Sequence, residues 1–102
     1  MNGFGLNDEV LRQISGVVGN HPAVVSAAIF GSRAKGNHKK YSDIDICLYG
    51  PVSPEEAERI RSELLELDVI YNFDVATFDS IENLELRGHI TRCGVEFYNK
   101  EG

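Results

Sequence analysis

The order of apolar and polar positions predicts a chain that alternates between helices and strands. Apolar residues recur at every third or fourth position from Val10 to Val18, directly after Asn7 and two acidic residues. This spacing predicts an amphipathic helix with Asn7 as its N-cap and acids in its first turn. Residues 23–30 and 44–49 are short apolar runs, and each predicts a strand with a buried face.

The second half of the chain continues this alternation. Four more elements are predicted there, alternating between helix and strand: residues 53–67, 72–78, 79–92 and 95–98. Ser53 is the expected N-cap of the first helix, with Pro54 at its first position and Glu56 three residues after the cap. Asp79 or Ser80 is expected to cap the second helix. The order predicts an α/β (α+β) fold, in which helices flank a small mixed sheet of about four strands.

Length and composition fit one ordinary folded domain, expected to span residues 1–102. The chain is 42% hydrophobic and 25% charged, and no apolar run approaches the roughly 20 residues that cross a membrane. The N-terminus lacks the pattern of a signal peptide. Cys47 and Cys93 lie far apart and form no CxxC motif, which argues against a disulfide framework or a zinc site. We therefore expect a cytoplasmic protein with no membrane partner.

Charge is unevenly distributed along the chain. The formal net charge of −6 argues against direct nucleic-acid binding, which requires a basic surface. Four of the ten lysines and arginines nevertheless fall within eight residues: Arg33, Lys35, Lys39 and Lys40. A short basic segment on an acidic chain suits a small anion such as a phosphate. The alternative is an ordinary solvated loop.

Two aspartates inside the second apolar run are the first candidate for chemistry. Asp43 and Asp45 are two residues apart, so in a strand they point to one face while Ile44 and Ile46 point to the other. Two carboxylates this close repel each other, and a divalent cation removes the repulsion. Oxygen ligands favour Mg²⁺ or Mn²⁺. The alternative is a pair of exposed acids on a solvated sheet face.

The turn after the first apolar run is a candidate phosphate site. Gly31 and Ser32 follow Phe30 and begin a turn that leads towards a short helix over residues 31–35. Free N–H groups at such a turn attract phosphate, the Ser32 hydroxyl adds a donor, and Arg33 or Lys35 adds positive charge. It is not a P-loop, because Asn-His follows where Lys-Ser/Thr is required. An ordinary strand-to-helix turn is the alternative.

A third acid interrupts the apolar stretch "YNFDVATF". Asp74 is costly inside a strand unless it faces water, a partner or a metal ion. If its strand lies beside residues 44–49, three carboxylates converge, and they can hold two metal ions. Asp74 is then placed to accept the proton of an attacking hydroxyl. The alternative is an exposed aspartate on an edge strand.

Together these residues resemble a known family. Gly31-Ser32, ten intervening residues and Asp43-Ile44-Asp45 resemble the GSx10DxD signature of the DNA polymerase beta nucleotidyltransferase superfamily. The stretch GSRAKG followed by SDIDI is similar to its minimal nucleotidyltransferase branch, called MNT. The resemblance covers roughly residues 8–98, and Asp74 falls where the family has its third carboxylate.

The resemblance implies an activity and a role for each candidate residue. Members bind a nucleoside triphosphate with two Mg²⁺ ions, transfer a nucleoside monophosphate to a hydroxyl and release pyrophosphate. Asp43 and Asp45 correspond to the ligands of both metals, and Asp74 to a ligand of the catalytic metal that helps to activate the acceptor. The implied phosphate-binding residues are Gly31, Ser32, Arg33 and Lys35.

The resemblance also implies a partner. Larger relatives carry a helical domain that contacts base and acceptor, so here a helical HEPN-type or substrate-binding protein is expected to supply that surface in a hetero-oligomer. In some such pairs the partner is a ribonuclease toxin, and the nucleotidyltransferase is an antitoxin that adds AMP to its tyrosine. We therefore expect a protein adenylyltransferase that uses ATP or another triphosphate. The alternatives are a non-catalytic antitoxin that masks its partner, and transfer to a small molecule.

Other polar and aromatic residues are expected to be structural. His21 is assigned to the scaffold or the solvent-facing surface, and Arg87 and Arg92 are expected to face solvent from the last helix. Tyr41 or Tyr71 is a weaker candidate for stacking on a base.

Overall fold

The computed structural model describes residues 8–31 and 43–101. The elements follow the predicted order: α1 (Asp8–Gly19), β1 (Ser26–Phe30), β2 (Ile44–Tyr49), α3 (Pro54–Leu65), β3 (Phe73–Thr77), the 3-10 turn η1 (Phe78–Ser80), α4 (Leu84–Cys93) and β4 (Val95–Asn99). The predicted Asn7 cap and the helix expected over residues 31–35 fall on residues that the structure does not describe, except for Gly31.

The four strands form one mixed sheet in the order β3-β2-β1-β4. Strand β1 runs antiparallel to both β2 and β4, whereas β2 and β3 are parallel. A parallel pair needs a crossover connection, and α3 supplies it. The predicted fold class, a small mixed sheet flanked by helices, is confirmed.

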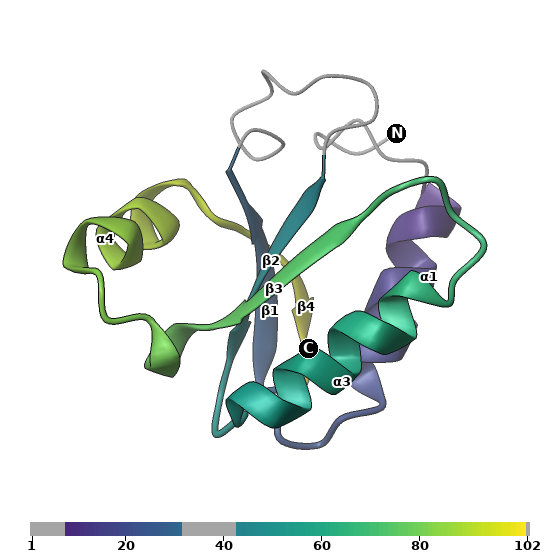
Figure 1. Ribbon diagram of the computed structural model, residues 1–102, viewed down its shortest axis with the longest axis horizontal. Helices are drawn as coiled ribbons and strands as arrows, with labels where there is room; N and C mark the ends of the chain where they lie inside the picture. Colours follow the sequence, from purple (N-terminus) through teal and green to yellow (C-terminus); the bar gives the residue numbers. More distant parts are fainter. Residues whose placement is uncertain (1–7, 32–42, 102) are drawn as a thin grey trace.

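The two faces of the sheet have different coverings. Helices α1 and α3 pack on one face, whereas α4 lies on the other side of the sheet (Figure 1). The face beneath α1 and α3 holds the hydrophobic core, and its largest fully buried strand side chains are Ile29, Ile44, Ile46, Leu48 and Phe73. Because side chains alternate along a strand, the residues between these point to the opposite face.

Local chemistry explains where the helices begin. The Ser53 hydroxyl accepts a hydrogen bond from the Glu56 amide at 3.1 Å, as predicted for α3. The predicted cap of the last helix was wrong: α4 is capped by Asn83, whose side chain accepts from the Leu86 amide at 3.1 Å. Residue Phe78 stacks on Tyr49 at 5.0 Å between ring centroids, which holds the chain against the sheet before the helix starts.

Strand β1 begins at Ser26, three residues later than predicted. The Val24 amide donates to the His21 carbonyl at 3.0 Å, so the chain is still turning there. The His21 ring joins this connection to α3, because its two nitrogens lie 3.1 and 3.0 Å from carboxylate oxygens of Glu56 and Glu63. His21 is therefore a structural residue, as expected.

Both cysteines are free, and Cys47 is buried. Among the described residues, no helix combines the length and the apolar character that crossing a membrane requires.

Candidate active site

Strand pairing brings two of the predicted carboxylates together. The parallel register of β2 and β3 places Asp45 directly opposite Asp74, with Ile44 opposite Phe73. Both aspartates therefore point away from the core, to the face of the sheet on which α4 lies. Asp43 immediately precedes β2 and is exposed, as is Asp74, whereas Asp45 is half-buried. The strand register thus places Asp74 beside Asp45, whereas the convergence of all three acids and the catalytic role of Asp74 stay predictions.

The electrostatics of this site centre on Asp45. Burial, followed by the neighbouring charges of Asp74 and Asp43, raises the pKa of the Asp45 carboxyl above its usual value. Ionising the Asp45 carboxyl is thus unfavourable unless a cation compensates. The donor set consists of carboxylate oxygens, which fits Mg²⁺ or Mn²⁺. Within the described ranges no three acidic, histidine or cysteine side chains form a metal-binding group.

Gly31, the first residue of the predicted phosphate-binding turn, lies beside Asp45. Its φ of +76° lies in the left-handed region that favours glycine. A Cβ atom at this position would lie 2.5 Å from the Asp45 Oδ2 atom. Only glycine therefore lets the end of β1 approach the Asp45 carboxylate this closely. The other three predicted phosphate ligands, Ser32, Arg33 and Lys35, lie outside the described residues.

One cavity opens on the same face of the sheet as the acids. It has a volume of about 300 Å³ and lies between the second half of α4 and strands β1, β2 and β4. Its walls include Tyr49 from β2, Ala28 from β1, Ile90 from α4 and Glu96 from β4. We call this space the α4 cavity.

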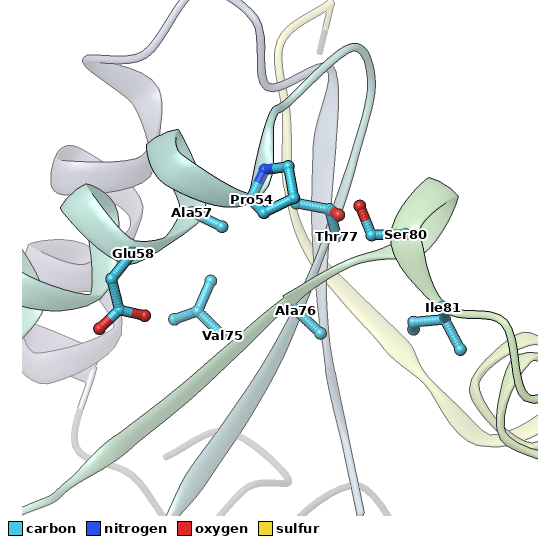
Figure 2. A pocket seen from close by; sticks show the side chains of 8 residues that line it. All are labelled: Pro54, Ala57, Glu58, Val75, Ala76, Thr77, Ser80 and Ile81. Atoms are coloured by element: carbon cyan, nitrogen blue, oxygen red, sulfur yellow. The ribbon is translucent and has the colours of Figure 1, made fainter.

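A second cavity, of about 280 Å³, lies beside α3, on the opposite face of the sheet. It is formed by the first turns of α3, strand β3 and the turn after it (Figure 2). Glu58, Thr77 and Ser80 are its polar side chains. The buried Thr77 hydroxyl has no hydrogen-bond partner among the described residues. This cavity lies at the C-terminal end of β3, away from Asp74 at the start of the strand.

An aromatic group at the rim of the α4 cavity was missed by the sequence reasoning. Tyr49 stacks on Phe78, and the Arg87 guanidinium lies 4.6 Å from the centre of the Phe78 ring. Arg87 is half-buried, so the expectation that it simply faces solvent was wrong. The available signal was the period of two along β2, which puts Asp45, Cys47 and Tyr49 on one face.

Cys47 lies between Asp45 and Tyr49 along β2, and its thiol is unreactive. Burial raises the pKa of its thiol to about 11, although a hydrogen bond with Tyr49 works in the opposite direction. The thiol therefore stays protonated at neutral pH and is not a nucleophile.

Comparison with known proteins identifies the class. A family model described as Polymerase beta, Nucleotidyltransferase matches residues 12–102, and the chain belongs to this family. It has a nucleotidyltransferase domain, as its motifs indicated. No curated protein matches the chain.

Solved structures share the fold at low sequence identity. A chain of a toxin–antitoxin complex with AMP-PNP superposes with a TM-score of 0.72 at 19% identity, over 92% of this chain and 74% of that one. A chain of the complex between a tri-AMPylated HEPN toxin and MNT antitoxin from Shewanella oneidensis superposes with a TM-score of 0.71 at 15% identity. The match covers 94% of this chain and 75% of that one. A nucleotidyltransferase-like protein from Sulfolobus solfataricus gives 0.54 at 19% identity, over 99% and 92%.

Proposed function

We propose that residues 1–102 form a single minimal nucleotidyltransferase domain that transfers AMP from ATP to a hydroxyl of a helical HEPN-type partner protein. In this proposal the chain is the antitoxin half of a cytoplasmic two-component pair. The observation that carries it is that Gly31, Asp45 and Asp74 lie side by side at the ends of three adjacent strands. Structural neighbours with a HEPN toxin or AMP-PNP support the choice of partner and nucleotide.

The proposed metal ligands are Asp43, Asp45 and Asp74. Two Mg²⁺ ions, when bound, neutralise charge on the phosphates and on the attacking oxygen. Asp45 is the central ligand because it lies between the glycine turn and Asp74. Asp74 also accepts the proton that the acceptor hydroxyl loses. The proposed ligands of the outer phosphates are Gly31, Ser32, Arg33 and Lys35.

The order of these groups across the sheet suits an in-line displacement. Gly31 directly follows β1, Asp45 lies on β2 and Asp74 lies on β3, and these strands are neighbours in that order. The acceptor oxygen attacks the α-phosphorus from the Asp74 side. The bond from that phosphorus to the bridging oxygen breaks, and pyrophosphate leaves with the electron pair towards Gly31.

The test is transfer of label from ATP carrying ³²P at the α-phosphate, with Mg²⁺ and an extract of the source cells. We expect a labelled partner band with the wild-type chain and none with Asp43→Asn/Asp45→Asn. Asp68→Asn/Asp79→Asn removes two exposed carboxylates elsewhere and should label normally. ATP labelled at the γ-phosphate should leave the band dark. Equal labelling by the Asp43/Asp45 variant would exclude this site.

A non-catalytic antitoxin that masks its partner is the second candidate. Two leucines on the first turn of α4 favour it, because Leu84 is 78% exposed and Leu86 is 37% exposed. Exposed apolar side chains at a helix start are suited to a protein contact. If the Asp43→Asn/Asp45→Asn variant still neutralised the partner, while labelling was absent with both forms, masking would replace transfer as the function.

A further inference from the structure

The α4 cavity begins two residues along the sheet from Asp45. Ala28, which lines it, pairs with Cys47, two residues beyond Asp45 on the same face. Tyr49, which also lines it, is two residues further. At about 3.3 Å per residue, the cavity therefore extends from about 7 to about 13 Å beyond Asp45. A nucleoside attached to a phosphate at Asp45 has to span this distance over the side chains that cover Cys47, which is fully buried.

In the proposed reaction, the direction along β2 from Asp45 towards Tyr49 is free for the nucleoside. Pyrophosphate and acceptor occupy opposite sides of the α-phosphorus, along the line from Gly31 to Asp74 that crosses the strands. The bond to the ribose must leave that line sideways. One sideways direction runs along β2 towards Tyr49, where the α4 cavity lies.

The walls of the cavity match the chemistry of a nucleobase. Its volume of about 300 Å³ falls at the lower end of the range for small-molecule pockets. Ala28 and Ile90 supply apolar surface, and Tyr49 supplies an aromatic ring. Phe78 stacks on Tyr49 but does not itself line the cavity, whereas Tyr49 does. Bases stack favourably on such rings.

A carboxylate gives this cavity a preference among bases. Glu96 pairs with Ala28 across the β1–β4 register and lines the cavity. One of its oxygens accepts a hydrogen bond from the Asn99 side-chain amide at 3.2 Å. An ionised carboxylate only accepts, and it has about four lone-pair positions, so capacity remains for a donor on a ligand.

We propose that the α4 cavity binds the nucleobase of the triphosphate, with Tyr49 as its stacking surface and Glu96 as the acceptor for an exocyclic amino group. This inference rests on the proposed function and deepens it. It makes Tyr49 and Glu96 the residues that determine nucleotide specificity, and it replaces Tyr41 and Tyr71 as candidates for stacking. Adenine carries the required amino group, whereas hypoxanthine, the base of ITP, has a carbonyl oxygen at that position.

Binding can be measured without an acceptor and without turnover. Calorimetric titrations with Mg²⁺ use ATP and ITP analogues in which a methylene group replaces the oxygen between the α- and β-phosphates. We expect wild-type protein to bind the ATP analogue at least about tenfold more tightly, because hydrogen bonds to charged groups have a substantial net effect. Glu96→Gln should remove that preference, since a glutamine amide can also donate to the carbonyl of hypoxanthine.

Variants of the tyrosine test the stacking contact. Tyr49→Leu should weaken binding of the ATP analogue about tenfold, whereas Tyr49→Phe should retain it. Glu58→Gln makes the same acid-to-amide change in the second cavity and should leave both affinities unchanged. Thermal unfolding followed by circular dichroism checks that each variant is folded.

Several outcomes would overturn the inference. One is wild-type affinity in folded Tyr49→Leu, and another is an ATP preference that survives in Glu96→Gln. A third is a Tyr49→Leu variant that changes only the KM for the acceptor protein, which would assign the cavity to the acceptor. If the wild-type chain bound neither analogue, the proposed function itself would fail. If the wild-type chain bound the ATP analogue but the variants did not behave as expected, only the proposed base site would be refuted.

Discussion

The two faces of the sheet are built from the same strands but carry opposite kinds of residue. On the face under α1 and α3, Ile44, Ile46 and Leu48 are fully buried. On the opposite face the intervening residues of β2 are Asp45, Cys47 and Tyr49, which lead from the acids to the α4 cavity. The period of two along β2 thus places three buried aliphatic residues on one face and Asp45 on the other, where Cys47 is buried as well.

The difference also shows where the fold bears an electrostatic cost. The buried face gains from burying apolar area, whereas the other face holds a half-buried carboxylate beside two more. Raised pKa values of this kind recur at functional sites, because the charges that chemistry requires are rarely those that stabilise the free protein. The comparison predicts that substitutions on the two faces have opposite effects on stability and activity.

The largest effect is expected from Asp45→Asn. Transfer should fall at least about a hundredfold, since electrostatic groups at the reacting phosphate contribute this much or more. Stability without metal should rise at neutral pH. The pKa of Asp45 is raised in the folded state, so its contribution is favourable below the unfolded value and is lost as pH rises through the folded value.

Thermal unfolding at pH 7 and pH 3, with added chelator, checks the stability half of this prediction. The gain in midpoint should be present at pH 7 and absent at pH 3. A variant that unfolds at a lower temperature than wild type at pH 7 would contradict the idea that repulsion at Asp45 destabilises the free protein. Asp79→Asn, an exposed aspartate in η1, is the matched control.

The next effect compares adjacent residues of β2. Leu48→Ala should lower the free energy of unfolding by about 2–5 kcal/mol, because it leaves a cavity in the core. Tyr49→Phe, one position later on the other face, should cost less than about 1.5 kcal/mol, since it removes only a hydroxyl. Urea denaturation measures both, and equal costs would mean that the two faces contribute alike.

Gly31→Ala should destabilise by at least about 1–2 kcal/mol, the cost of left-handed backbone for a residue with a side chain. The added methyl group also meets the Asp45 carboxylate, so transfer should fall as well. Gly16→Ala is the control, because a Cβ there contacts nothing within 4 Å in the exposed part of α1. That substitution should be stabilising by up to about 1 kcal/mol, since alanine favours helix. If both variants behaved alike, the special role of the Gly31 backbone would be refuted.

The smallest effect concerns the buried side of the molecule, where His21 links the α1–β1 connection to α3. Burial lowers the pKa of His21, but hydrogen bonds and charge from Glu63 and Glu56 outweigh it, so the pKa is raised above 6.5. Two carboxylate partners at 3.0–3.1 Å require both ring nitrogens to carry protons. The stabilisation is therefore complete below about 6.5 and lost as pH rises through the folded pKa.

An NMR titration of the His21 ring and unfolding midpoints at pH 5.5 and 8.5 test this link. The wild-type chain should lose more stability between these values than His21→Gln, which does not titrate. A pKa at or below 6.5 in the folded protein would contradict the doubly protonated bridge.

Local patterns in the sequence were sufficient for several features. The span of β2, and the placing of Asp45, Cys47 and Tyr49 on one of its faces, follow from alternation within six residues. The start of α3 follows from Ser53 and Pro54, because a cap depends on atoms a few residues away. The order of elements, and a motif specific enough to indicate the family, were likewise available from neighbouring residues.

Other features depended on how distant segments pack. The register that sets Asp45 opposite Asp74 is a property of two strands joined through α3, and neither strand encodes it alone. The same holds for the contact between Gly31 and Asp45, for the capping of α4 by Asn83 after Phe78 has stacked on Tyr49, and for the bridge from His21 to α3. The sequence by itself determined which residues carry charge and which way each strand alternates. Only the tertiary structure decided which of these residues meet, because side-chain contacts between segments depend on packing and not on local periodicity.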